Sequence, residues 1–445
     1  MRAATQSARP ISVINVDTTL IFFALLALSN ALTPLMYDLT GSRAESYTDA
    51  NPFRLVTSLV IYTISAVMLC YTMNDAKRVL ERAPLMVFAF LLPLISMVWS
   101  VDPSTTFRRA GAYFLTGVFC LYLVTRLSPE EFLRRMLKVF FVGGVASLLY
   151  AVFVPKFGIH QDAVLHGAWK GVYGHKNDLG RICAIAVITA AFCQPLTKAQ
   201  QRMRWATIAI FLFLVVMSES RTNWFILLGS CTLTPIVKIL RSQKISLGLR
   251  IFFVASLLLG VVLMTSVGAD QMLSAAGRDA TLSGRHTLWL GVSNTIAAKY
   301  PYLGAGYGAF FTEKGGISDL APYLTYWTGI PNHAHSGYLN VRADLGIPGI
   351  LVLTLMIVVL GVRLVRLLIR EPQRQAWMGF TCLFFLFLIN NYTESVSFKH
   401  SDIAWVIFVV IYLYTAIQPA NTRAPRQIGV KRRAPLPALP ARAAP

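Results

Sequence analysis

Charged residues are scarce in this chain of 445 residues. They make up 14 % of the sequence, whereas hydrophobic residues make up 55 % and the mean hydropathy is +0.57. Soluble domains carry about 25 % charged residues, so this composition argues against a water-soluble enzyme. Acidic residues are the scarcest, 20 against 41 Lys and Arg, and the net charge is +21. The basic residues lie between apolar runs, so their excess does not indicate nucleic-acid binding.

Cysteines with metal-binding spacing are also missing. None of the six cysteines forms a CxxC pair, and all lie inside or at the edges of apolar runs. This pattern argues against a disulfide framework or a zinc site and is typical of small core residues. The six are Cys70, Cys120, Cys183, Cys193, Cys231 and Cys382.

Long apolar runs are abundant instead. A helix that crosses a bilayer needs about 20 mostly apolar residues, and about twelve runs qualify, which predicts an all-α polytopic membrane protein. Arg2 and Arg9 precede the first run as in a signal peptide, but no A-x-A cleavage site follows, so we expect it to be retained. The runs are 19–37, 53–72, 84–100, 110–125, 138–155, 180–196, 205–218, 224–240, 249–268, 347–365, 376–391 and 403–418.

The distribution of Lys and Arg orients these spans. With the N-terminus inside, the inner segments hold 26 of the 41 basic residues but only 6 of the 20 acidic residues. Cytoplasmic loops carry an excess of Lys and Arg, so we attribute the positive net charge to membrane topology. Both termini are then expected in the cytoplasm. The expected parts are a cytoplasmic N-terminus (1–18), nine transmembrane helices (19–268), a long periplasmic loop (269–346), three further helices (347–418) and a disordered basic cytoplasmic tail near anionic lipid (419–445).

Polar chemistry gathers in the loops assigned to the outer face. These loops include the two longest connections, about 156–179 and 269–346, and long loops are commonly functional. We therefore expect the site at the outer membrane boundary. The predicted spans hold no Asp or Glu well inside them, which weakens a coupled transporter but leaves a lipid flippase open. All seven histidines lie in outer loops: His160, His166, His175, His286, His333, His335 and His400.

The segment GHKNDLG at 174–180 places His175, Lys176 and Asn177 immediately before an apolar run. A lysine and a helix N-terminus both attract anions, so these residues are candidate anion contacts. In the alternative interpretation, Asn177 or Asp178 caps the helix while His175 and Lys176 face water.

Two arginines stand out in outer segments. Arg221, in SESRTNW at 218–224, lies in a short turn where its guanidinium can grip phosphate oxygens at two points. The alternatives are an arginine that snorkels to the interface or pairs with Glu219. A helical turn over SGRHTLW at 283–289 is expected to place Leu288 and Trp289 against the membrane face and Arg285 on the other side. A solvated arginine is the alternative there.

The segment NHAHSGYL at 332–339 contains His333 and His335, followed by Tyr338. On a helix, residues two apart point to different sides, so a shared metal would require a strand or a loop. Because the sequence shows no ligand set beside them, we favour one histidine as a proton acceptor and no metal. The glycine-rich PYLGAGYGAF at 301–310 lacks a βαβ context, so it predicts a turn-rich segment and not a dinucleotide loop.

Together with WSVDPSTTFRRA at 99–110 and HAHSGYLNVRADLGIPG at 333–349, these segments resemble the O-antigen ligase and polymerase superfamily, especially its ExoQ-type exopolysaccharide polymerases. The resemblance implies a GT-C-type glycosyltransferase, independent of metals and cofactors, that acts on undecaprenyl-pyrophosphate-linked oligosaccharides at the periplasmic face of a bacterial inner membrane. It implies that Arg221 and Arg285 hold the pyrophosphate and that His335 is the catalytic base. Additional substrate contacts are expected at His175, Lys176, Asn177, His333 and Tyr338.

The chemistry suits these residue types. A departing pyrophosphate gains negative charge that fixed arginines stabilise, and a neutral histidine can accept the proton of the attacking hydroxyl in an inverting displacement. The expected function is polymerisation of lipid-linked repeat units. Alternatives are a ligase that delivers the glycan to lipid A core or another acceptor, and a flippase for the same lipid-linked sugars. Expected partners are the bilayer, a chain-length regulator and export proteins, with no nucleic acid.

Overall fold

The computed structural model describes residues 11–32, 34, 52–162, 165–220, 223, 224, 227, 229, 246, 285–324 and 331–418. Within these ranges the protein is helical, as the sequence predicts, and a single isolated bridge between Ile159 and Trp169 is the only β pairing. The principal helices are α1 (Ile11–Leu28), α3 (Pro52–Cys70), α4 (Met73–Glu81), α5 (Pro84–Ile95), α6 (Pro103–Arg126), α7 (Pro129–Phe153), α8 (Pro155–Gly158), α9 (Lys176–Phe192), α10 (Lys198–Met217), α14 (Arg285–Lys299), α15 (Ile317–Leu320), α16 (Gly337–Arg370), α17 (Gln375–Thr393) and α18 (Ile403–Ile417).

Local sequence signals set several helix starts. Asp102 caps α6 by accepting the Thr105 N–H, and Ser128 caps α7 by accepting the Glu131 N–H. Each cap is followed by a proline, which is favoured in the first helical turn because its missing N–H is not needed there. Asp402 caps α18 in the same way. At each of these starts a side chain therefore accepts one or two of the free backbone N–H groups.

Three described helices are long and apolar enough to cross a membrane: α7, α16 and α17. A fourth span results if the bent pair α3 and α4 is taken as one. This indicates a membrane protein, while the predicted count of about twelve spans stays a prediction. Ten of the predicted runs fall on described helices, whereas 224–240 and 249–268 lie almost wholly outside the described residues.

The helices form one large core and one small one. The large core contains the fully buried Trp377, Trp405 and Tyr113 and extends across the helices assigned to the membrane. The small core gathers α14, the segment that follows it and the first turns of α16, and includes Leu288 and Phe310. The prediction that Leu288 lies against the membrane, on the other side of the helix from Arg285, was wrong: Leu288 is buried in this small core, and residues three apart lie on the same side of a helix. The part of the predicted loop 269–346 that the structure describes is itself a packed unit.

Helix α16 begins at Gly337, ten residues before the predicted run 347–365, and it is broken at Gly346, where φ is +63°. A Cβ at this position would overlap the carbonyl oxygen of Tyr302. The segment 301–306 pairs with the break, since the Ala305 N–H donates to the Ala343 carbonyl and the Ile347 N–H donates to Tyr302. Gly304, Gly306 and Gly308 all have positive φ, so 301–310 is turn-rich as predicted.

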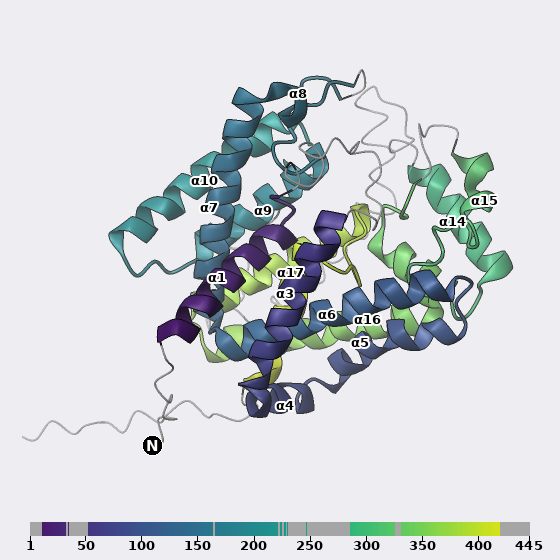
Figure 1. The fold of residues 1–445 in the computed structure, drawn as a ribbon, viewed down its shortest axis with the longest axis horizontal. Helices are drawn as coiled ribbons and strands as arrows, with labels where there is room; N and C mark the ends of the chain where they lie inside the picture. The colour runs from purple at the N-terminus through teal and green to yellow at the C-terminus, as the bar shows by residue number, and fades with distance from the viewer. Residues whose placement is uncertain are drawn as a thin grey trace, which may run out of the picture.

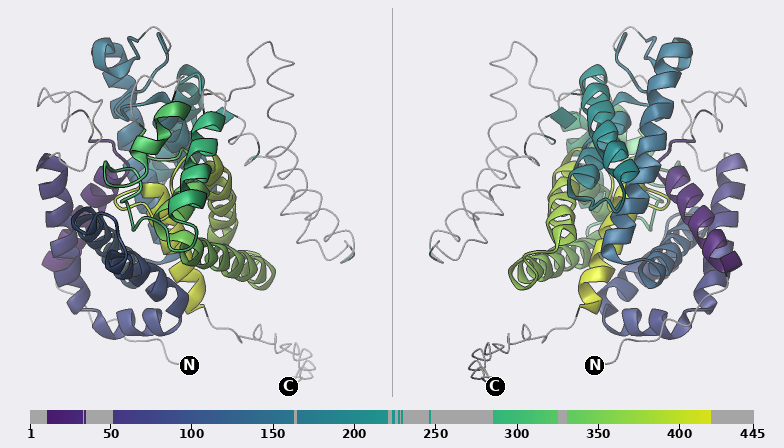
Figure 2. Two further views of the ribbon diagram at one scale, coloured as in Figure 1. Left: turned by 90° about the vertical axis from the view of Figure 1, so that its right-hand side faces the viewer. Right: turned by 90° about the vertical axis from the view of Figure 1, so that its left-hand side faces the viewer.

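Tertiary contacts join loops that the charge pattern assigns to the same side. Arg374 forms a two-point ion pair with Glu130, which links the segments before α17 and at the start of α7. On the side assigned to the outer face, the indole of Trp99 donates to the Leu303 carbonyl. Figures 1 and 2 show α4 at the bottom of the molecule, and Figure 1 shows α14 in its upper part, at the height of α9.

Candidate functional site

The two histidines of the HAH segment lie in a loop directly before α16. His335 has a φ of +48°, and the ring centroids of His333 and His335 are 4.1 Å apart, so both rings face the same side. The loop is held from two directions: the indole of Trp289 on α14 donates to the Ala334 carbonyl, and the Ala334 N–H donates to Asn340. Helices α14 and α16 therefore fix the position of the imidazoles.

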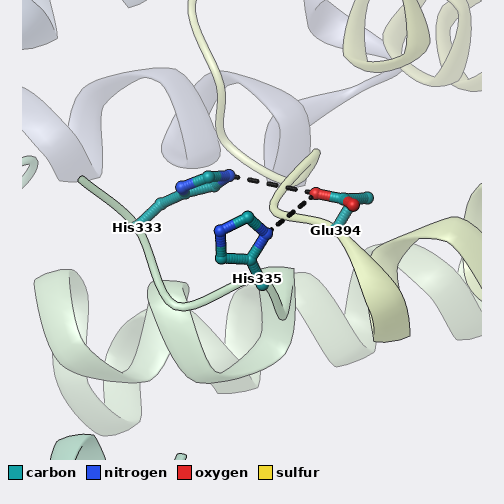
Figure 3. A group of neighbouring side chains, drawn as sticks. All are labelled: His333, His335 and Glu394. Carbon is teal, nitrogen blue, oxygen red and sulfur yellow. Dashed lines mark hydrogen bonds and ion pairs between the residues drawn. The ribbon is translucent and has the colours of Figure 1, made fainter. Parts of the chain in front are cut away.

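Glu394, which caps the end of α17, joins the histidines to Arg285. Its Oε2 lies 3.3 Å from Nδ1 of His335 and 3.9 Å from Nε2 of His333, and Figure 3 shows both rings directed at this carboxylate. Its other oxygen, Oε1, accepts a hydrogen bond of 3.0 Å from Nη2 of Arg285. One carboxylate thus holds a guanidinium with one oxygen and an imidazole with the other.

Electrostatics keep this cluster in a defined charge state. Burial alone would raise the pKa of Glu394, but the His335 hydrogen bond and the charge of Arg285 outweigh it and hold the pKa far below its usual range. Burial and the neighbouring His335 lower the pKa of His333, so that imidazole is neutral at neutral pH. An ionised Glu394 favours the His335 tautomer with the proton on Nδ1, which leaves Nε2 as the basic nitrogen.

The start of α9 lies beside this cluster. Asn177 lines one pocket together with Arg285, Glu394, Asn223 and two residues at the end of α17, Asn390 and Thr393. His175 is the N-cap of α9, because its Nδ1 accepts the Asn177 N–H at 3.1 Å. The alternative interpretation, in which Asn177 or Asp178 caps this helix, was therefore wrong, because the His175 imidazole accepts the backbone N–H that a shorter polar side chain would otherwise accept.

A second histidine supports the same helix start. Nε2 of His160 accepts the Lys176 N–H at 3.2 Å, and its Nδ1 lies 3.1 Å from Asp162. Burial and the positive charges near it lower the pKa of His160 to about 4, and burial also lowers the pKa of His175. Both rings must stay neutral, because protonation would place an N–H where each now accepts one.

This arrangement predicts an acid-sensitive fold. Below about pH 6.5 the unfolded chain takes up protons at these histidines, whereas folded His160 does so only near pH 4, so stability falls as the pH drops through this interval. We expect His160→Gln, which keeps an acceptor but cannot titrate, to reduce the loss of melting temperature between pH 7 and pH 4.5 by about 2 °C. Thermal unfolding in detergent at the two pH values measures this difference in melting temperature. His286→Gln, at an exposed position on α14, is the control. An unchanged pH dependence in His160→Gln would contradict this role.

The structure brings together some of the residues predicted from sequence. Arg285, His333 and His335 meet, and His175 and Asn177 lie at the neighbouring helix start. Tyr338 is not one of the described residues that line the pocket. Its hydroxyl donates to the Leu388 carbonyl and so links α16 to α17. Lys176 contributes its backbone N–H to His160.

Arg221 lies outside the described residues, but residues close to it on both sides are described. The Ser220 hydroxyl donates to Oδ1 of Asn177 at 3.1 Å, and the Asn223 amide donates to the Asn177 carbonyl at 3.2 Å. These contacts tie the segment that contains Arg221 to the start of α9, next to the pocket.

Sequence reasoning missed Glu394 and the buried amides Asn223 and Asn390. The available signal for Glu394 was its position just after the apolar run 376–391, in a short loop assigned to the outer face whose other acidic residue is Asp402. Nothing local distinguishes it from an ordinary surface glutamate, because its partners are 59 and 109 residues away in the chain.

The same three side chains form a possible set of metal ligands. His333, His335 and Glu394 can each present one ligand atom, and these atoms lie within 4.8 Å of one another. Two histidines and a carboxylate are a known ligand set for zinc and non-haem iron. Here, however, the guanidinium of Arg285 is paired with the carboxylate, and its positive charge opposes a second cation at that position. The absence of a metal from this cluster therefore stays a prediction.

Comparison with known proteins agrees with the resemblance seen in the sequence. Residues 206–354 match the family model described as O-Antigen ligase. The chain is also 26 % identical over 371 residues to the "Exopolysaccharide production protein ExoQ" of Rhizobium meliloti (strain 1021), which covers 75 % of this chain and 81 % of that protein. The predicted resemblance to the O-antigen ligase and polymerase superfamily, on its ExoQ-type side, is confirmed.

Proposed function

We propose that this protein polymerises undecaprenyl-pyrophosphate-linked oligosaccharide repeat units into exopolysaccharide at the periplasmic face of a bacterial inner membrane. The observation that carries the proposal is the Glu394 carboxylate, which holds a guanidinium suited to phosphate and an imidazole suited to a hydroxyl within one small site. The match to ExoQ, named for exopolysaccharide production, supports the choice of product. The apolar helices support the membrane location.

In the proposed reaction, Arg285 and Arg221 bind the pyrophosphate of the donor, which carries the growing chain. The hydroxyl of the next lipid-linked unit attacks the anomeric carbon from the face opposite the pyrophosphate. Its proton passes to Nε2 of His335 while the bond from the anomeric carbon to the phosphate oxygen breaks. Undecaprenyl pyrophosphate leaves with the bonding electrons, the configuration inverts, and the arginines stabilise the charge that develops on the leaving group.

Glu394 is a positioning residue in this scheme. Its negative charge stabilises the imidazolium formed when His335 accepts the proton, and it fixes the ring orientation. We expect Glu394→Gln to lower kcat by about 10–100-fold. Because the imidazolium loses its counter-charge, the acid limb of the pH–rate profile should also move to lower pH. A lower kcat with an unmoved profile would mean that Glu394 only maintains the fold.

Metal removal provides a separate prediction. Because fixed arginines supply the positive charge in this scheme, activity of the purified protein should remain within about twofold after EDTA treatment and exhaustive dialysis. Loss of activity that Zn²⁺ or Mg²⁺ restores would show that the two histidines and Glu394 serve a metal instead. Metal analysis of the dialysed sample is the matching control.

A ligase is the second candidate, favoured by the description of the family model that matches 206–354. The decisive experiment gives the protein in proteoliposomes lipid-linked repeat units alone and sizes the products on a gel. A ladder of longer chains supports the polymerase. Material that stays unextended until lipid A core or another acceptor is added supports the ligase.

A flippase for the same lipid-linked sugars makes a different prediction. In that case His335→Ala would block translocation, whereas units already on the outer side would still be extended by another protein. We expect the reverse, with extension lost and translocation unaffected. A chain-length regulator and export proteins are proposed partners of the polymerase, and both chain termini are proposed to be cytoplasmic.

A further inference from the structure

A chain of hydrogen bonds connects the break in α16 to the loop that carries the two histidines. Oδ2 of Asp344 accepts a hydrogen bond of 3.1 Å from Nδ2 of Asn340, which lies one turn earlier on α16. Oδ1 of Asn340 in turn accepts the Ala334 N–H at 3.1 Å. Because Ala334 lies between His333 and His335, the Asp344 carboxylate is linked to the backbone of the candidate site.

The donors and acceptors of this chain favour one orientation of the Asn340 amide. If the amide turned over, its Nδ2 would face the Ala334 N–H and its Oδ1 would face the Asp344 carboxylate. Two donors would then meet at one end and two acceptors at the other. The carboxylate therefore keeps the amide oxygen of Asn340 directed at Ala334.

The Asp344 carboxylate is itself held by the glycine-rich segment 301–310. Asp344 is buried, with 5 % of its surface exposed. Its Oδ1 accepts the Phe310 N–H at 3.4 Å, and its backbone carbonyl accepts the Gly306 N–H at 2.9 Å. Gly306 has a φ of +99°, a conformation that favours glycine. This turn-rich segment thus supports the end of the chain of hydrogen bonds that lies farther from the histidines.

The histidine loop requires such support because its backbone conformation is unfavourable. His335 has a φ of +48°, in the left-handed region that residues other than glycine rarely occupy. A residue stays in this region only where the surrounding contacts enforce it. Both backbone groups of the preceding Ala334 are bound by side chains, its N–H by Asn340 and its carbonyl by the Trp289 indole. Loss of the Asn340 contact would release one of these two attachments.

We propose that Asn340 and Asp344 are positioning residues for His335. The inference rests on the proposed function, in which His335 accepts the proton of the attacking hydroxyl. The two side chains act through the Ala334 backbone and keep Nε2 of His335 within reach of that hydroxyl. A misplacement of about 1 Å can cost about 10²-fold in rate, so a loosened loop should lower kcat and leave substrate binding nearly unchanged.

Asn340→Leu removes the acceptor of the Ala334 N–H and keeps a side chain of similar size. We expect kcat for chain extension to fall by about 10–100-fold, while KM for the repeat unit stays within about twofold of the wild-type value. Hydrogen exchange of the Ala334 amide should become about 10-fold faster, because this N–H loses its partner. Exchange is measured by mass spectrometry on the full chain in nanodiscs.

A reversal of the two side chains tests their direct contact. In Asp344→Asn alone, the new Nδ2 meets a donor whichever way it turns, either the Asn340 amide or the Phe310 N–H, so kcat should fall about 10-fold. Adding Asn340→Asp gives that Nδ2 an acceptor, while the other carboxylate oxygen still accepts the Ala334 N–H. The double variant should therefore return kcat to within about threefold of the wild-type value.

A second comparison separates positioning from general support of the fold. In the His335→Ala background, Asn340→Leu should lower the rate no further, because both changes remove the same proton acceptor. A role in folding alone would lower the rate by the same factor in both backgrounds. Asn294→Leu is the matched control. It removes an exposed amide that donates to Tyr323, and it should change neither kcat nor exchange at Ala334.

A normal kcat in Asn340→Leu would overturn the proposal, and so would a double variant no more active than Asp344→Asn. If Asn340→Leu does not fold, the comparison of Asp344→Asn with the double variant decides. Failure of the proposed function has a different signature, because the wild-type protein would then yield no extended product. The exchange measurements require no turnover and would still show whether Asn340 holds the Ala334 N–H.

Discussion

His335→Ala is expected to lower kcat for chain extension by about 10²–10⁴-fold, the range that a positioned proton acceptor contributes. Nδ1 of His335 lies 3.3 Å from Glu394, which leaves Nε2 to take the proton of the attacking hydroxyl. Because an imidazole that is already protonated cannot accept this proton, wild-type activity should also fall on acidification. Initial rates of product formation from lipid-linked repeat units, measured across pH, test both statements.

The control is His286→Ala, an exposed histidine on α14 next to Arg285, which should retain near-normal activity. Binding of the repeat unit to His335→Ala should change little, since the lost group acts mainly in the transition state. A His335→Ala enzyme with a normal rate and a flat pH profile would remove His335 as the base. His333 would then be the next histidine to test, because its ring lies beside that of His335.

Arg285→Lys is expected to lower kcat/KM by about 10²–10³-fold although the charge is kept. A guanidinium can pair with Glu394 and present further N–H groups to phosphate oxygens at the same time, whereas an ammonium is a compact point charge on a flexible stem. The loss should appear mainly in kcat, because the leaving group carries more negative charge in the transition state than in the bound substrate. We expect Arg221→Lys to act in the same direction.

Arg78→Lys provides the matched control. Arg78 lies on α4, its side chain is 72 % exposed, and it pairs only with Asp75 of the same helix among the contacts described. A normal rate in Arg285→Lys would show that any positive charge suffices there, which would contradict two-point phosphate binding. A change in KM alone would instead assign Arg285 to binding the substrate without a role in the reaction step.

The sequence predicts the residues that local pattern can mark. Apolar runs predict helices, and the isolated Arg285 and the closely spaced His333 and His335 stand out from their surroundings. These inferences succeed because each depends on residues within one or two helical turns of one another.

The centre of the site depends on long-range packing, which no local pattern records. Glu394 reaches His335 only because α17 packs along α16, and Arg181 of α9 reaches Asp402 across 221 residues of sequence. The buried amides appear in sequence as ordinary polar residues at helix ends. His175 as a cap was not expected, because caps are sought among short polar side chains and an imidazole performs the same task here.

The break in α16 at Gly346 limits how this protein can be engineered. The Ala343 and Asp344 carbonyls accept hydrogen bonds from the segment 301–306, and the Ile347 N–H donates to the Tyr302 carbonyl. Each segment therefore supplies the hydrogen-bond partners of the other. A chimera that took only the segment 301–306, or only α16, from a relative would leave backbone N–H and C=O groups at the break without their partners. Chimeras with relatives should therefore exchange residues 300–348 as one segment.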